Sequence, residues 1–219
     1  MPFERAACYT TNDFIDAKTN GYHHFDPPPP NKGFFYINGN DTNLKDFQTN
    51  MVHLSKAFGN YNLEGIHSPT RGFFTDVHHA YLAINYYHAD ESVRLLKAKM
   101  YDFFKRSDEN AIAFVCTNSR GAAYTRNCLY DMGEQYSKRV FLLGIAPAAY
   151  TPREICHDVM YIESRRDFVT YLDVSGRKRC NHTIITLNPH PEAAWHDHSL
   201  TSPTFLWTLQ QSGKLYLSE

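Results

Sequence analysis

Short apolar segments alternate with amphipathic segments along the chain from residue 33 to its end. The apolar cores, such as "GFFYI" and "VFLLGIA", are continuous, which is typical of strands covered on both faces. Strands are expected at 33–39, 61–69, 111–117, 139–147, 158–164 and 182–188, and helices at 41–59, 91–106, 121–138 and 202–212. This order predicts an α/β protein, a three-layer sandwich with a mostly parallel sheet and helices on both faces.

The proline run "PPPP" at 27–30 divides the chain into two parts. Consecutive prolines have no amide hydrogen to donate to a sheet or helix, so they favour an extended connector. We therefore expect an N-terminal arm over 1–32 and one domain over 33–219, in which the aromatic-rich segment 66–92 forms a lid or one wall of a cleft. The proline run is also a candidate ligand for a protein partner.

Composition excludes several classes of function. The formal net charge is −1, so the chain has no basic excess for wrapping nucleic acid. The five cysteines are odd in number and no two have a CxxC spacing, which favours reduced thiols.

Neither a signal peptide nor a transmembrane segment is visible, so the expected location is the cytoplasm, or delivery as a soluble protein. No oligomeric state can be inferred.

Nucleotide and metal sites are not expected, and the chain is predicted to need no cofactor. "GIAPAAY" and "INGNDTN" lack both the dinucleotide-binding glycine pattern and a phosphate-loop lysine. The chain has 12 histidines, but none of their clusters has the spacing of a zinc-binding helix or a matching cysteine pair.

The segment "CTNSRGA" is the strongest candidate for a reactive site. Here a predicted strand turns sharply into a predicted helix, and small residues stand two before and two after Ser119. Such a turn projects the serine above the sheet at a helix N-terminus, where partial positive charge favours an oxyanion. The alternative is that Ser119 only caps the helix.

A nucleophilic serine needs a base and an acid that orients it, and later strand ends supply candidates. Asp167 lies just past the strand at 158–164, and His198 lies in the loop that precedes the last helix. His196 is an alternative base and Asp173 an alternative acid. The order serine, aspartate, histidine is the one found in α/β-hydrolases.

The region from residue 33 to the end resembles the α/β-hydrolase fold. "CTNSRGA" is similar to its nucleophile elbow, "YIESRRDFV" to its acid loop, "DHSLTSPTF" to its histidine loop, and "FFYINGN" to the strand before its oxyanion loop. The resemblance implies Ser119 as nucleophile, His198 as base and Asp167 as the orienting acid. It also implies an oxyanion hole formed by the backbone amides of Arg120 and Asn40.

A closer likeness, carried by "IAPAAY", "RRDFV" and "DHSLTSPTF", is to uncharacterised hydrolase-like proteins of chlamydia-related bacteria. The chain departs from the usual elbow at two positions, with Asn118 before the serine and Thr117 in place of the first glycine.

The expected function is that of a serine hydrolase of esterase or lipase type, which cleaves an ester, thioester or amide through an acyl-enzyme on Ser119. Its substrate would be a small or acylated molecule. The alternative is a catalytically inactive, hydrolase-like binding or effector module, because the two departures and the absence of a substrate signature leave reactivity open.

Overall fold

A computed structural model describes residues 5–15, 24–39, 42–69, 82–84 and 90–216, with side chains described up to residue 210. Seven strands form one sheet in the order β1-β3-β2-β4-β5-β6-β7. All neighbours are parallel except β1 and β3, which are antiparallel. The strands are β1 (Ala7–Thr10), β2 (Lys32–Ile37), β3 (Glu64–His67), β4 (Ile112–Ser119), β5 (Val140–Pro147), β6 (Asp158–Ser164) and β7 (Ile184–Leu187).

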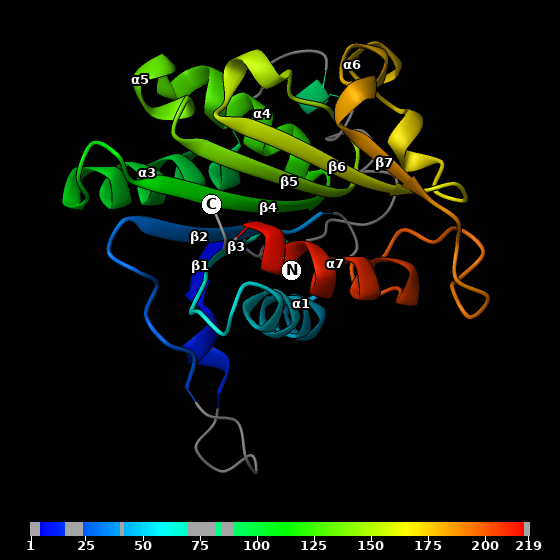
Figure 1. Ribbon diagram of the computed structural model, residues 1–219, viewed down its shortest axis with the longest axis horizontal. Helices are drawn as coiled ribbons and strands as arrows, with labels where there is room; N and C mark the ends of the chain where they lie inside the picture. Colours follow the sequence, from blue (N-terminus) through cyan, green and yellow to red (C-terminus); the bar gives the residue numbers. More distant parts are fainter. Residues whose placement is uncertain (1–4, 16–23, 40–41, 70–81, 85–89, 217–219) are drawn as a thin grey trace.

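Helices cover both faces of this sheet (Figure 1). The α-helices are α1 (Leu44–Ala57), α3 (Glu91–Arg106), α4 (Gly121–Met132), α5 (Glu134–Ser137), α6 (Val174–Arg179) and α7 (Pro203–Tyr216). Short 3-10 turns are η1 (Thr11–Phe14), η2 (Arg153–Ile155), η3 (Val169–Tyr171) and η4 (Asn181–Thr183). Helices α1 and α7 lie on one face, and α3 and α4 on the other. The predicted α/β class, with a mostly parallel sheet and helices on both faces, is confirmed.

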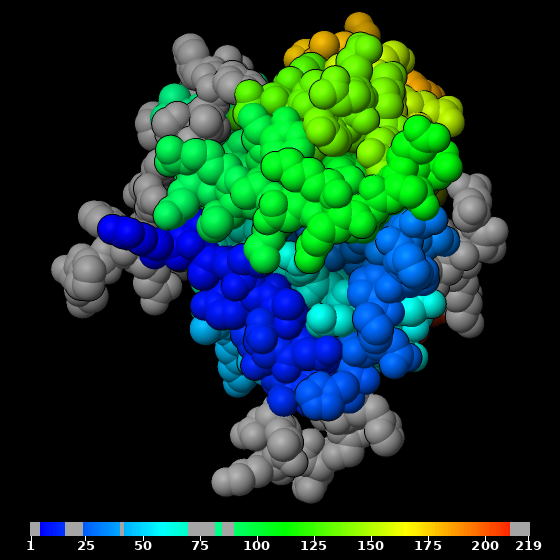
Figure 2. Space-filling view, turned by 90° about the vertical axis from the view of Figure 1, so that its left-hand side faces the viewer, coloured from blue at the N-terminus to red at the C-terminus, as the bar shows by residue number. Residues whose placement is uncertain are grey.

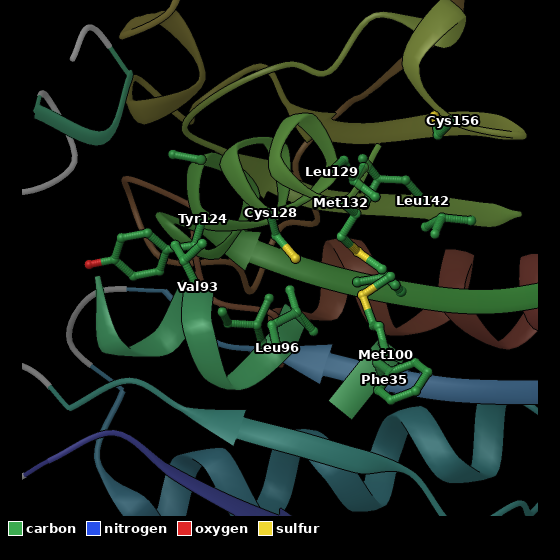
Figure 3. Close-up of a cluster of buried hydrophobic side chains, with 14 of the residues drawn as sticks. Phe35, Val93, Leu96, Met100, Tyr124, Cys128, Leu129, Met132, Leu142 and Cys156 are labelled. Carbon is green, nitrogen blue, oxygen red and sulfur yellow. The ribbon is translucent and has the colours of Figure 1, made fainter. Parts of the chain in front are cut away.

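Each central strand contributes to two hydrophobic cores because successive side chains point to opposite faces. On β2, Phe35 and Ile37 pack with α3 and α4, whereas Phe34 and Tyr36 pack with α1 and α7. Figure 3 shows the first of these cores, where Leu96 and Met100 of α3 meet Cys128 and Leu129 of α4. The continuous apolar sequence of the strands is thus explained by burial on both sides.

The ends of the long helices follow local sequence signals. The side chain of Asn43 accepts a hydrogen bond from the backbone N–H of Asp46 at the start of α1, and Asp90 accepts one from Ser92 at the start of α3. Lys105 and Arg106 occupy the last turn of α3, where positive charge complements the helix dipole. The helix predicted over 121–138 is interrupted at Gly133, whose φ of 81° lies in the left-handed region.

The described part of the N-terminal segment joins the sheet. Strand β1 pairs with β3, and the Thr11 amide donates to the Leu63 carbonyl at 3.0 Å. The Ala6 amide also donates to the Glu91 carboxylate of α3 at 3.2 Å. Figure 2 shows these dark-blue residues on the surface beside green residues of α3. The division into an arm over 1–32 and a domain over 33–219 stays a prediction.

None of the described helices combines the length and the apolar character that crossing a membrane would require.

Candidate active site

The turn between β4 and α4 holds Ser119 in a strained backbone conformation. Its φ of 54° lies in the left-handed region, which non-glycine residues rarely adopt and which occurs often at functional sites. The pairing of β4 with β5 shifts register between Asn118 and Ser119, because Ala146 of β5 is left unpaired at a φ of 47°, so β5 forms a bulge beside Ser119. The Ser119 carbonyl accepts a hydrogen bond from the Ala148 amide at 3.0 Å, which fixes the turn against β5.

Two glycines give this turn the space it needs. A Cβ atom at Gly121 would lie 2.5 Å from the carbonyl oxygen of Ile37, so α4 starts directly against the end of β2. A Cβ atom at Gly39 would lie 2.1 Å from Cβ of Ser119 and 2.8 Å from its Oγ. The backbone after β2 therefore lies against the Ser119 side chain, and only glycine fits at position 39.

Asp167 and His198 meet at the same edge of the sheet. Nδ1 of His198 lies 2.7 Å from Oδ2 of Asp167, while Oδ1 of Asp167 accepts a hydrogen bond from the Val169 amide at 3.0 Å. The Asp167 side chain is fully buried and that of His198 is 18% exposed. Because an ionised carboxylate only accepts hydrogen bonds, Nδ1 carries the proton and Nε2 of neutral His198 is an acceptor.

Ser119 and His198 are both described, and no hydrogen bond joins them. Ser119 is 1% exposed. Catalytic hydrogen bonds are often long in the absence of substrate and shorten only when it binds. Of the three residues proposed from the sequence, the structure thus joins two directly and places the third in a strained turn at the carboxyl edge of the same parallel sheet.

The alternative residues have other surroundings. Asp173 caps α6 and pairs with Arg126, whose Nη1 lies 2.9 Å from its Oδ2. The Nδ1 atom of His196 is buried and has no hydrogen-bond partner among the described residues, and its ring contacts that of Trp195.

Of the two residues predicted for the oxyanion hole, the structure describes Arg120 but not Asn40. Arg120 is 2% exposed, with Nη2 3.3 Å from Oγ of Ser68 and the guanidinium over the Tyr124 ring. Asn40 lies outside the described residues, as does most of the predicted lid over 66–92.

Asp197, which sequence reasoning did not select, fixes the loop between the two histidines. It is 1% exposed, and its φ of 36° is positive. Its carboxylate accepts hydrogen bonds from the hydroxyls of Ser164 at 2.5 Å, Ser202 at 2.5 Å and Thr204 at 2.7 Å. These donors come from the end of β6 and the start of α7, so the carboxylate ties the histidine loop to both. The Ser202-Pro203 pair is a visible helix-start signal, but its link to Asp197 is not visible in the sequence.

A polar cavity of about 240 Å³ opens beside His198. Its lining comes from the start of α1, the end of β4 and the histidine loop: Thr42, Asp46, Thr49, Asn50, Asn118, His196, His198, Ser199, Leu200 and Thr201. Hydroxyl, amide and carboxyl groups predominate, so the cavity suits a polar rather than an aliphatic group.

The thiol next to the turn has no sign of activation. Cys116 is 1% exposed within β4, and burial raises its pKa, so the thiol stays protonated near neutral pH. All five cysteines are unpaired with one another.

Within the described ranges, no group of three or more His, Cys, Asp or Glu side chains is arranged to hold a metal ion.

One family model matches most of the chain. A family model described as "Protein of unknown function (DUF687)" matches residues 24–215. No curated protein sequence matches the chain.

Three solved esterase structures are similar to this chain. Esterase E25 has a TM-score of 0.56 and 11% identity, covering 89% of this chain and 72% of its own. LipW from Mycobacterium marinum has a TM-score of 0.56 and 10% identity, covering 97% and 81%. An arylesterase has a TM-score of 0.55 and 9% identity, covering 88% and 77%. These likenesses confirm the predicted α/β-hydrolase fold.

Proposed function

The chain belongs to the DUF687 family, and from this premise and its α/β-hydrolase fold we propose that it is a serine hydrolase acting on esters, thioesters or amides. The observation that carries the proposal is the 2.7 Å contact between His198 and Asp167 at the sheet edge where Ser119 adopts a positive φ. Fold likeness alone would not distinguish an enzyme from a binding module, because one fold supports many functions.

In the proposed reaction, Oγ of Ser119 attacks the acyl carbon while Nε2 of His198 takes the hydroxyl proton. Asp167 holds the imidazole in the required tautomer and stabilises the cation that forms. The oxyanion accepts hydrogen bonds from the amides of Arg120 and Asn40. His198 then protonates the leaving group, and water releases the acyl group from Ser119.

The cavity beside His198 supports a polar leaving group or acyl group. Its hydroxyl and amide lining would form hydrogen bonds with hydroxyl-rich or amide-bearing substrates. The closer likeness to proteins of chlamydia-related bacteria stays a prediction.

A second candidate is a hydrolase-like binding module without activity. It is favoured by the burial of Ser119 and by the absence of a hydrogen bond between the described residues Ser119 and His198. The polyproline segment is then the candidate contact for a protein partner.

A fluorophosphonate probe, which modifies activated serines covalently, separates the two candidates. We expect stoichiometric labelling of the intact protein, measured by mass spectrometry. Ser119→Ala should remove the label, and Ser107→Ala, at the far end of α3, should keep it. A folded protein that stays unlabelled would contradict the hydrolase.

The choice between the two histidines follows from the same assay. His198→Ala should slow labelling by about 10⁴-fold or more, because loss of the base costs nearly as much as loss of the nucleophile. His196→Ala should change the rate by less than about tenfold, since no hydrogen bond joins this ring to Asp167. If both variants slowed labelling equally, the assignment of His198 as the base would be wrong.

A further inference from the structure

The segment between β6 and β7 combines exposed basic residues with buried acidic ones. Five of the chain's 22 Lys and Arg residues lie within 165–179, although the formal net charge of the whole chain is −1. The two acids of this segment, Asp167 and Asp173, are 1% and 4% exposed. The guanidinium of Arg177 forms a salt bridge with the buried carboxylate of Glu163.

The exposed charges of this segment are therefore all positive. They are Arg165, Arg166, Lys178 and Arg179. The adjacent loop adds the exposed carboxylate of Glu192, so a cationic excess remains.

The same segment exposes large apolar side chains. Phe168, Tyr171 and Leu172 stand at helical spacings of three and four and are 52%, 52% and 46% exposed. Val174 follows at 68% exposure, whereas Thr170 on the opposite side of the turn is fully buried. Side chains with this spacing lie on one face of η3 and the residues that flank it, and this face points to solvent.

Trp195 extends this apolar surface from a second loop. It is 78% exposed, and its ring stacks on that of Phe168 at 6.3 Å between centroids with an interplanar angle of 18°. Phe168 directly follows Asp167, and Trp195 precedes His198 by three residues. The segment between β7 and α7 that contains Trp195 is drawn in orange in Figure 1. The surface formed by Phe168, Tyr171, Leu172, Val174 and Trp195 with the four cations is called the basic-aromatic face below.

We propose that the basic-aromatic face binds an anionic lipid bilayer. Aromatic and aliphatic side chains enter the interfacial layer of a bilayer, and adjacent Lys and Arg side chains are attracted to anionic headgroups. A protein partner would need acidic groups around an apolar surface, whereas an anionic bilayer supplies both over any area. Binding here would place the His198–Asp167 pair next to the lipid surface. The proposal goes beyond the hydrolase function, because membrane association does not require Ser119.

Vesicle flotation of the full chain tests the charge requirement. Vesicles of phosphatidylcholine and phosphatidylglycerol at a ratio of about 3 to 1 should bind the protein, and pure phosphatidylcholine vesicles should bind it at least about tenfold more weakly. Lys178→Glu with Arg179→Glu should weaken binding to the mixed vesicles by about 30-fold or more. The matched control is Lys105→Glu with Arg106→Glu, another exposed Lys-Arg pair in the last turn of a helix, and it should leave binding unchanged.

Tryptophan fluorescence tests the apolar contact, because the chain has only two tryptophans, Trp195 and Trp207. Both are exposed, and Trp207 lies on α7 outside the basic-aromatic face. Trp207→Phe, which keeps Trp195, should show a blue shift with the mixed vesicles, and Trp195→Phe should show none.

Three outcomes would overturn the proposal. They are equal binding to both vesicle types, equal weakening by the two Lys-Arg double variants, and a blue shift that comes from Trp207. Ser119→Ala should bind vesicles like the unaltered protein, so failure of the hydrolase function and failure of this proposal are distinguishable.

Discussion

The turn after β4 and the loop before α7 lie at the same edge of the sheet, and each contains a non-glycine residue with positive φ, Ser119 or Asp197. The turn is held by backbone packing, since Gly39 and Gly121 let neighbouring strand ends approach it closely. The loop is held by side chains, since one buried carboxylate accepts three hydroxyl hydrogen bonds. Adding a side chain at one of the glycines should therefore disrupt the turn, whereas removing the carboxylate should disrupt the loop.

The largest effect is expected from Asp197→Ala. It removes the shared acceptor of the Ser164, Ser202 and Thr204 hydroxyls and leaves three buried O–H donors without that acceptor, which should lower the free energy of unfolding by about 3–5 kcal/mol. Denaturant unfolding measures this loss. Asp102→Ala on α3, which changes an exposed side chain, should stay within about 0.5 kcal/mol.

Asp197→Asn refines the same test, because asparagine tolerates positive φ and keeps one acceptor oxygen. It should retain part of the stability but still slow fluorophosphonate labelling, since His198 is the next residue. An unchanged labelling rate in folded Asp197→Asn would show that the carboxylate stabilises the loop without positioning His198.

A smaller loss of stability is expected from Gly39→Ala. The added methyl would overlap Ser119, and relief of this overlap should cost about 1–3 kcal/mol of unfolding free energy. Displacement of Oγ by about 1 Å should also slow labelling by about 10²-fold.

Gly133→Ala is the matched control for Gly39→Ala. An added Cβ there meets nothing within 4 Å, but φ is 81°, so stability should fall by about 1–2 kcal/mol while labelling is retained. Retained labelling in Gly39→Ala as well would mean that the backbone after β2 does not constrain Ser119.

The difference between the turn and the loop also explains which features could be predicted from the sequence. The turn after β4 was predictable because its causes are local: an apolar strand, a serine and a glycine two residues later. Strands β5 and β6 were likewise predicted to within a residue, since burial on both faces leaves an uninterrupted apolar run. Such signals belong to neighbouring residues along the chain.

The remaining features depend on contacts between distant segments. The pairing of β1 with β3 joins residues 7–10 to 64–67, and apolar periodicity carries no information on such partners. The link from Asp197 to Ser164 spans 33 residues. Strand order and the hydroxyl cluster could not be read from the sequence for this reason, whereas the apolar strands and the turn could.

The smallest effect is expected from Thr117→Val, which tests whether the departure from glycine at the elbow matters. Thr117 is fully buried, and its hydroxyl has no hydrogen-bond partner among the described residues. Valine has nearly the same shape without the polar atom, so the free energy of unfolding should rise by about 1 kcal/mol. Labelling of Ser119 should be unchanged, because the backbone that positions it is retained.

The reciprocal substitution on the same face of β4, Val115→Thr, should cost about 1–3 kcal/mol by burying a hydroxyl without a partner. If Thr117→Val instead lowered stability or slowed labelling, the hydroxyl would have a role at the turn. If Thr117→Val is tolerated, position 117 requires a small residue and not glycine itself. The close backbone approaches at this turn occur at Gly39 and Gly121 instead.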